Sequence, residues 1–375
     1  MRKTIFNLER FSGIVAMVLV LILAASSVLF HYRVATTTPG RADVYFAWTD
    51  GVRLANGENP YSRIHEGDMR NNTGNYATYT PSFYVFTAFL YRLGVTEYES
   101  MLVVWRPICE LSHFLMAVLL LGVGWRRGNI LFGCLAACFW FYNRWTLAVV
   151  NIAHLDTLAL LLWTSSLLLL SNARTRSVSH LLFGCSLAVK QMALFAIPIY
   201  VIWEFREGTR STAVRRSLQC LGLVLMIPFL VSFPFLVTDP LGYIKSILFS
   251  GTRLACGDFS SKSIDAAVGL TGILARVPML GLLTLLYGVS CTRSVGKFST
   301  ALMMMAIILD FNSVLYFQYM IWAVPLLPLA LLETRLPIDV SRESSPHDNI
   351  VPLSAGSGDA APRPVAGGVV AGSAS

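Results

Sequence analysis

The sequence predicts an all-α polytopic membrane protein with about ten transmembrane helices and a long first extracytoplasmic loop. Of its 375 residues, 55% are hydrophobic and 13% are charged, whereas soluble domains carry about 25% charged residues. Apolar runs recur along the chain, so the low charge content does not come from a single anchor. The runs are continuous and do not alternate with polar residues, which argues against a transmembrane β-barrel.

The basic residues lie in short clusters between the apolar runs. The net charge is +8, but this distribution is the positive-inside pattern of cytoplasmic loops and not that of a nucleic-acid-binding surface. With the clusters placed in the cytoplasm, the connections on the other side of the membrane are 31–80, 148–156, the region around residue 190, 238–262 and 311–315. The seven cysteines are scattered, without zinc or redox spacing.

The two ends of the chain differ in kind. The first apolar run, residues 11–30, follows Arg2, Lys3 and Arg10. Its roughly 20 residues exceed the apolar core of a signal peptide, so we expect an uncleaved first helix with a cytoplasmic N-terminus. Residues 337–375 are rich in Gly, Ala, Ser and Pro, and we expect a disordered cytoplasmic tail there. Residues 1–336 would then form the transmembrane domain.

Two apolar runs are too short for the crossings that this topology needs. The run 180–203 must enter the membrane and return within about 24 residues, too few for two full spans. Two half-length helices that meet near Lys190 would satisfy it, and such broken helices occur where they line a cavity or are buried in protein. The run 81–93 is either a short crossing or re-entrant. The other runs are 101–124, 129–148, 150–171, 217–237, 264–291, 298–311 and 314–332.

The loop 31–80 carries the first candidate site. It holds five arginines, five acidic residues and no lysine. We expect a short helix over 43–55, in which Asp43 and Asp50 lie two turns apart on one face. The two acids could belong to a solvated connector with scattered ion pairs, or they could form one wall of a site.

Other polar residues interrupt or border the later apolar runs. His154 and Asp156 stand at the predicted outer end of a long helix, where they either cap it or bind a polar substrate. Lys190 lies inside an apolar stretch, where it either snorkels to the interface or meets a buried partner such as a phosphate. Arg144 and Arg253 lie at or near predicted outer connections, and a basic excess on that side favours an anionic ligand.

Taken in order along the chain, these motifs resemble those of the GT-C glycosyltransferases, polytopic enzymes that use a polyprenyl-phosphate sugar. The similarity is greatest to the catalytic subunit of GPI mannosyltransferase I and to bacterial polyprenyl-phosphate-mannose-dependent mannosyltransferases. It covers roughly residues 1–335. The segments that carry it are Asp43, "GENPY" at 57–61, "YTP" at 79–81, "AHLDT" at 153–157 and "FQYMIWAVPLLPLAL" at 317–331.

The resemblance implies a GT-C-like fold and an inverting transfer of mannose or another hexose to a lipid or glycan acceptor, with Asp43 as general base. It implies cationic contacts to the leaving lipid phosphate from Lys190, Arg144 and Arg253. The residues left to bind sugar or shape the pocket are Asp50, Tyr61, Tyr79, His154, Asp156 and Gln191. Where eukaryotic members have Asp-x-Asp, this chain has Arg41 and Asp43, which leaves dependence on a divalent cation open.

Two other classes of protein compete with an enzyme. A transporter or lipid flippase would also have about ten helices, but it predicts an internal repeat and polar residues spread through mid-membrane. A non-catalytic assembly subunit would tolerate the loss of Asp43. For the enzyme, we expect a bacterial inner membrane or a plasma membrane, with the donor and acceptor as its partners.

Overall fold

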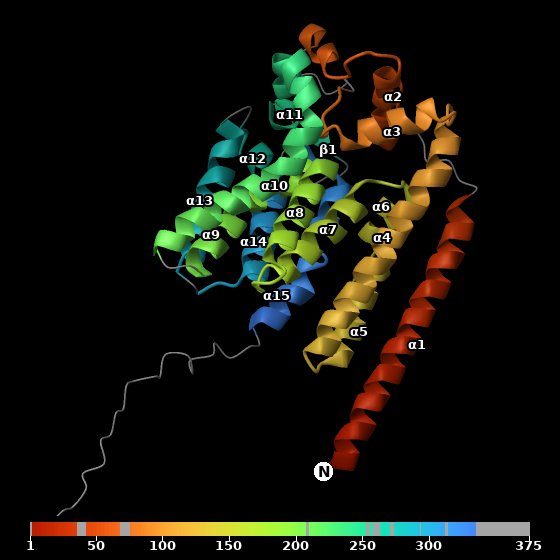
Figure 1. Cartoon of the computed structure of the whole chain (residues 1–375), viewed down its shortest axis with the longest axis vertical. Coiled ribbons are helices and arrows are strands. Elements are labelled where there is room, and N and C mark those ends of the chain that lie inside the picture. Colours follow the sequence, from red (N-terminus) through yellow and green to blue (C-terminus); the bar gives the residue numbers. More distant parts are fainter. Residues whose placement is uncertain are drawn as a thin grey trace, which may run out of the picture. The chain divides into compact units, whose positions relative to one another are not determined.

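A computed structural model of the chain describes residues 2–35, 43–67, 76–207, 210–252, 256–257, 263–270, 274–292, 294–311 and 314–334. The described helices belong to one compact unit, Met1–Arg335, shown in Figure 1. The predicted tail, 337–375, lies outside the described residues. Within the described residues the fold is helical, apart from two parallel strands of two residues each, β1 (Cys256–Gly257) and β2 (Val314–Leu315).

Three helices are long and apolar enough to cross a membrane, by length and composition: α1 (Arg2–Ala35), α4 (Tyr98–Arg126) and α10 (Arg210–Thr238). The other long elements are α2 (Asp43–Ala55), α3 (Ser82–Arg92), α5 (Ile130–Phe141), α6 (Arg144–Asn151), α7 (Asp156–Leu169), α8 (Arg176–Val189), α9 (Ile197–Glu207), α11 (Pro240–Thr252), α13 (Val277–Ser290), α14 (Lys297–Asp310) and α15 (Leu326–Thr334). Short turns of helix are η1 (Ser62–Glu66), η2 (Gln191–Ala196), α12 (Ile264–Ala267), η3 (Leu274–Arg276) and η4 (Phe317–Trp322).

Several apolar runs that predict single helices are broken into shorter ones. The run 129–148 becomes α5 and α6, because the Asn143 side chain accepts a hydrogen bond from the Trp145 backbone N–H and starts a new helix there. The run 264–291 is likewise divided among α12, η3 and α13. Length and composition alone therefore identify three spans among the described residues, and not about ten.

The predicted break at Lys190 is confirmed. Helix α8 ends at Val189, Lys190 has extended backbone angles (φ −154°, ψ 124°), and the chain continues through η2 into α9. The Thr80 hydroxyl donates to the carbonyl oxygens of Leu187 (3.1 Å) and Ala188 (2.7 Å). These bonds satisfy backbone acceptors that the end of a helix leaves without partners.

The predicted short helix at 43–55 is also confirmed, as α2. It packs closely on α3, and Gly51 is the point of nearest approach. A Cβ atom at Gly51 would lie 1.8 Å from the Thr87 Oγ1 atom and 3.0 Å from the Tyr84 carbonyl oxygen. Because a Cβ atom has no room there, packing against α3 constrains the position of α2, the helix that carries Asp43.

Connections that the charge pattern places on one side of the membrane contact one another. Strand β1 of the connection 238–262 pairs with β2 of the connection 311–315. The Asp239 carboxylate accepts hydrogen bonds from Ser62 (2.9 Å) and His65 (2.9 Å) of η1. The segments that the sequence assigns to the extracytoplasmic side therefore form a joined group.

Candidate active site

Asp43 is the first residue of α2, and 48% of its side chain is exposed. Its Oδ2 atom accepts hydrogen bonds from the Tyr79 hydroxyl (2.9 Å) and the Gln318 amide (3.0 Å), and it lies 3.3 Å from His154 Nε2. Within the described residues no donor is bonded to Oδ1. Asp43 therefore has one anchored oxygen, Oδ2, and one oxygen, Oδ1, to which no described residue donates.

His154 lies behind Asp43 in the turn between α6 and α7. Its side chain is fully buried, and its second ring nitrogen, Nδ1, contacts the Asp156 carboxylate. The preceding residue, Ala153, has a positive φ of 53°, which is uncommon outside glycine. The Trp105 indole N–H donates to the Ala153 carbonyl oxygen at 2.8 Å. Helix α4 thus holds a strained turn that aims the imidazole at Asp43.

Asp156 and Lys190 form a buried ion pair at the inner end of this network. The Lys190 Nζ atom lies 2.6 Å from Asp156 Oδ2, and both side chains are at most 4% exposed. The Trp322 indole N–H donates to the other carboxylate oxygen, Oδ1. The Lys190 ammonium also lies over the rings of Tyr79 and Tyr319, 5.6 and 5.5 Å from their centroids, where the aromatic faces attract it.

The contacts of the network favour the ionised form of Asp43. Burial alone would raise the pKa of Asp43, but the hydrogen bond and positive charge of His154, together with Lys190, hold that pKa well below its usual value. Burial and Lys190 lower the pKa of His154, but Asp156 and Asp43 outweigh them, so the net shift of that pKa is upward. Asp43 and Asp156 thus face the Lys190 ammonium and an imidazole whose pKa is raised.

The structure brings together five residues that the sequence singles out from distant motifs: Asp43, Tyr79, His154, Asp156 and Lys190. Two more of the predicted residues, Tyr61 and Gln191, bond to the backbone of the segment that carries Tyr79.

Tyr61 is fully buried and donates its hydroxyl proton to the Tyr79 carbonyl oxygen at 2.7 Å. The Gln191 amide donates to the Thr78 carbonyl oxygen. These two residues thus position the segment that carries Tyr79, and they have no contact with Asp43 within the described residues.

Asp50 lies apart from the network. It is 2% exposed and pairs with Arg53 (2.9 Å) and, more distantly, with Arg63 (3.7 Å). Burial raises the pKa of its carboxyl to about 6, against the opposing effect of the two guanidinium groups. Because Asp50 is turned toward arginines, it cannot complete a cation site with Asp43.

The residues around Asp43 do not fit a divalent cation. Its anchored oxygen faces hydrogen-bond donors, which compete with a metal ion for the same lone pairs. The described residues also hold no group of three or more His, Cys, Asp or Glu side chains with the geometry of a metal site. The divalent cation that the sequence leaves open therefore has no ligand set in this part of the chain.

The two arginines predicted to contact phosphate do not join the network. Arg144 is exposed at the start of α6, with its guanidinium 4.6 Å from the centroid of the Trp145 ring. No contact links it to Asp43 or Lys190 among the described residues. Arg253 lies outside the described residues. Lys190 is the predicted phosphate contact that does reach the site, and its ammonium is bonded to Asp156.

The sequence motifs did not single out three residues of η4 that line the network: Gln318, Tyr319 and Trp322. A polar amide inside the last apolar run was the available signal, because a buried polar group needs a partner.

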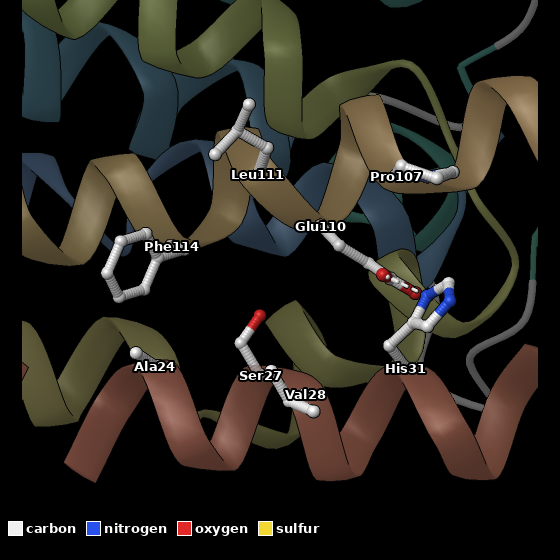
Figure 2. A pocket seen from close by; sticks show the side chains of 8 residues that line it. All are labelled: Ala24, Ser27, Val28, His31, Pro107, Glu110, Leu111 and Phe114. Atoms are coloured by element: carbon white, nitrogen blue, oxygen red, sulfur yellow. Dashed lines mark hydrogen bonds and ion pairs between the residues drawn. The ribbon is translucent and has the colours of Figure 1, made fainter. Parts of the chain in front are cut away.

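A cavity of about 360 Å³ lies elsewhere, between α1 and α4, as Figure 2 shows. Its lining is mostly apolar and contains no residue of the Asp43 network. The one ion pair beside it joins His31 Nδ1 to Glu110 Oε2 at 2.6 Å. This pair ties α1 to α4 and gives the cavity a polar end.

No family model, curated protein or solved structure matches this chain. The network around Asp43 and the sequence motifs therefore carry the functional argument by themselves.

Proposed function

We propose that the chain is an integral-membrane glycosyltransferase of the GT-C type. It would transfer mannose or another hexose from a polyprenyl-phosphate donor to a lipid or glycan acceptor at the extracytoplasmic face, with inversion. The observation that carries this proposal is Asp43, an accessible and ionised carboxylate that Tyr79, His154 and Gln318 hold from three separate segments.

In the proposed reaction the acceptor hydroxyl attacks the anomeric carbon of the sugar. The bond from that carbon to the phosphate oxygen breaks, and its electron pair leaves with the lipid phosphate. The hydroxyl proton passes to Oδ1 of Asp43. A carboxylate with a lowered pKa is a weak base, so it takes the proton late, when bond formation has made the hydroxyl acidic.

The buried charges behind Asp43 supply the electrostatics of the proposed site. Lys190 neutralises Asp156, and Asp156 in turn orients the His154 ring toward Asp43. The proposal therefore uses Lys190 first as a counter-charge. Its remaining N–H donors can meet the phosphate of a donor that enters beside Tyr79 and Tyr319.

The proposed ten-span GT-C fold has two further supports. The helix break at Lys190 places irregular backbone next to buried charge, as a site within a membrane requires. The connections that the charge pattern assigns to the extracytoplasmic side contact one another, through the pairing of β1 with β2 and through Ser62 and Asp239. We propose a bacterial inner membrane or a plasma membrane as the location.

The same observations give a transporter as the second candidate. Buried ionisable residues beside a discontinuous helix are a feature of ion-coupled transport sites. Here Lys190 caps such a break and pairs with Asp156. A transporter would move its substrate across a sealed bilayer and form no glycosidic bond, and this difference separates the two functions.

The test is sugar transfer by the purified protein in a lipid bilayer. Radiolabelled polyprenyl-phosphate-mannose is the donor and a membrane lipid extract is the acceptor. We expect a labelled product, and we expect Asp43→Asn to lower its rate by about 10²-fold or more. The matched control is Glu58→Gln, an exposed acid of the same loop, which should keep the wild-type rate.

Failure of the wild type with mannose, glucose and arabinose donors, together with substrate uptake into proteoliposomes, would favour the transporter. Transfer by the wild type at a rate that Asp43→Asn leaves unchanged would keep the enzyme and remove Asp43 as its base.

A further inference from the structure

His154 is unusual among the described histidines because both of its ring nitrogens face a carboxylate. Nε2 lies 3.3 Å from Asp43 Oδ2, and Nδ1 contacts Asp156 Oδ2. A neutral imidazole carries one N–H, so it can donate to one carboxylate only and must turn a lone pair toward the other. Two lone pairs facing each other repel, whereas an imidazolium donates to both carboxylates.

The surroundings of His154 favour the charged ring as well. Its side chain is fully buried, and the groups that face it come from every element packed around it. They are Asp43 of α2, Asp156 of α7, Lys190 at the end of α8, Tyr79 before α3 and, at the backbone carbonyl oxygen, Cys109 of α4. Gln318 and Tyr319 of η4 reach the same cluster through Asp43 and Lys190.

The charges of this set balance only when His154 is positive. Asp43 and Asp156 contribute two negative charges, and Lys190 contributes one positive charge. A neutral His154 would leave one uncompensated negative charge in a largely buried cluster, which is costly. The upward shift of the His154 pKa agrees with this balance.

We propose that His154 is a positioning residue that works as an imidazolium: it bridges Asp43 and Asp156, keeps Asp43 ionised, and fixes Oδ2, which leaves Oδ1 for the acceptor. The assignment of charge does not depend on the proposed function. The consequence for sugar transfer rests on the proposed function. The two can therefore fail separately.

The charge is tested on the wild-type protein without any substrate. Magic-angle-spinning NMR of protein in bilayers, with ¹⁵N-labelled histidine and ¹³C-labelled aspartate, reports which ring nitrogens carry protons. Among the described histidines, His154 alone correlates with two aspartate carboxylates, which assigns its signals without a variant. We expect two protonated nitrogens at pH 7. One protonated nitrogen at pH 7 would overturn the proposal.

The positioning role is tested by the pH profile of transfer. His154→Gln keeps a donor for Asp43 and removes the positive charge. We expect kcat to fall roughly 10-fold to 100-fold, with KM little changed and with the alkaline limb of the wild-type profile abolished. A profile with the same limb in His154→Gln would overturn the role.

A second variant, Asp156→Asn, keeps an acceptor for Nδ1 and removes its charge. It should let the His154 ring lose its proton at lower pH, and an unchanged ring would contradict the bridge. If the imidazolium is found and no transfer occurs with any donor, the proposed function fails while the charge assignment stands.

Discussion

Asp43 and Asp50 are the same residue type on one helix, two turns apart, but their pKa values are shifted in opposite directions. Asp43 is half exposed, and its pKa lies below its usual value, while Asp50 is buried and its pKa is raised to about 6. Asp50 nevertheless has two guanidinium groups within 4 Å, from Arg53 and Arg63. A count of neighbouring cations would predict the reverse order.

Burial raises the pKa of both carboxyl groups, so the difference shows that the groups in contact with each carboxylate decide the outcome. Arg53 and Arg63 are each about a third or more exposed, so water screens their charge while Asp50 itself is desolvated. Asp43 lies at the first turn of α2, where the helix dipole favours an anion, and it receives three short contacts. Helix α2 therefore carries one carboxylate available to a ligand and one that is part of its packing.

Among the variants that change the Asp43 network, removal of Lys190 should lower stability the most. Lys190→Met removes the ammonium that pairs with the buried Asp156 and leaves that carboxylate only His154 and the Trp322 indole, so we expect the free energy of unfolding to fall by about 3 kcal/mol. Chemical denaturation in detergent measures it. Lys297→Met is the control, because this buried lysine contacts the Ser171 hydroxyl and aromatic rings. Equal losses in the two variants would contradict the ion pair.

A methyl group at Gly51 should move α2 as a whole. Gly51→Ala places Cβ against Thr87 and the Tyr84 carbonyl oxygen, and we expect a loss of about 1–3 kcal/mol in stability. Because Asp43 moves with the helix, transfer should fall as well. Gly222→Ala, where a Cβ meets nothing within 4 Å, is the control for the same change in thermal unfolding. Wild-type stability in Gly51→Ala would show that α3 does not fix α2.

Loss of one hydrogen-bond donor to Asp43 should lower the rate of sugar transfer without unfolding the protein. Gln318→Leu removes the amide that contacts Oδ2 at 3.0 Å, and a hydrogen bond to a charged group contributes about 1.5–3 kcal/mol. We expect transfer to fall roughly tenfold or somewhat more. Gln219→Leu, at an exposed position of α10, should be neutral. An unchanged rate in Gln318→Leu would remove η4 from the site.

The smallest effect concerns the pH dependence of stability at Asp50. Its folded pKa of about 6 exceeds the unfolded value of 3.8, so the folded state binds more protons between these values. Its contribution is present below pH 3.8 and is lost as pH rises through about 6. As the pH rises from 4 to 6, Asp50→Asn should therefore lose less stability than the wild type. Parallel thermal-unfolding curves for the two proteins would contradict the raised pKa.

Local patterns were enough to predict the elements that carry the site. The composition of 43–55 gave helix α2 with Asp43 in its first turn, and Lys190 inside an apolar run gave the helix break. In each case residues close in sequence determine the backbone conformation. The split of the run 129–148 was missed because its only marker is Asn143, a single capping residue between aromatic and basic neighbours.

The partners of the charged groups could not be predicted in the same way. Asp156 and Lys190 are 34 positions apart, and Asp43 and Gln318 are 275 apart. No periodic pattern reports such contacts, because they depend on how whole helices pack. The same limit applies to Arg144, which lies exposed beside Trp145 and has no contact with Asp43 or Lys190 among the described residues.

The most direct test of the account is the ratio of two transfer rates, for Asp43→Asn and Asp50→Asn, measured in the same bilayer at pH 7. Both variants remove one negative charge from α2 and change little in volume. The account predicts that Asp50→Asn transfers sugar at least about 10²-fold faster than Asp43→Asn. Equal rates, or a greater loss in Asp50→Asn, would contradict the central claim that Asp43 is the base.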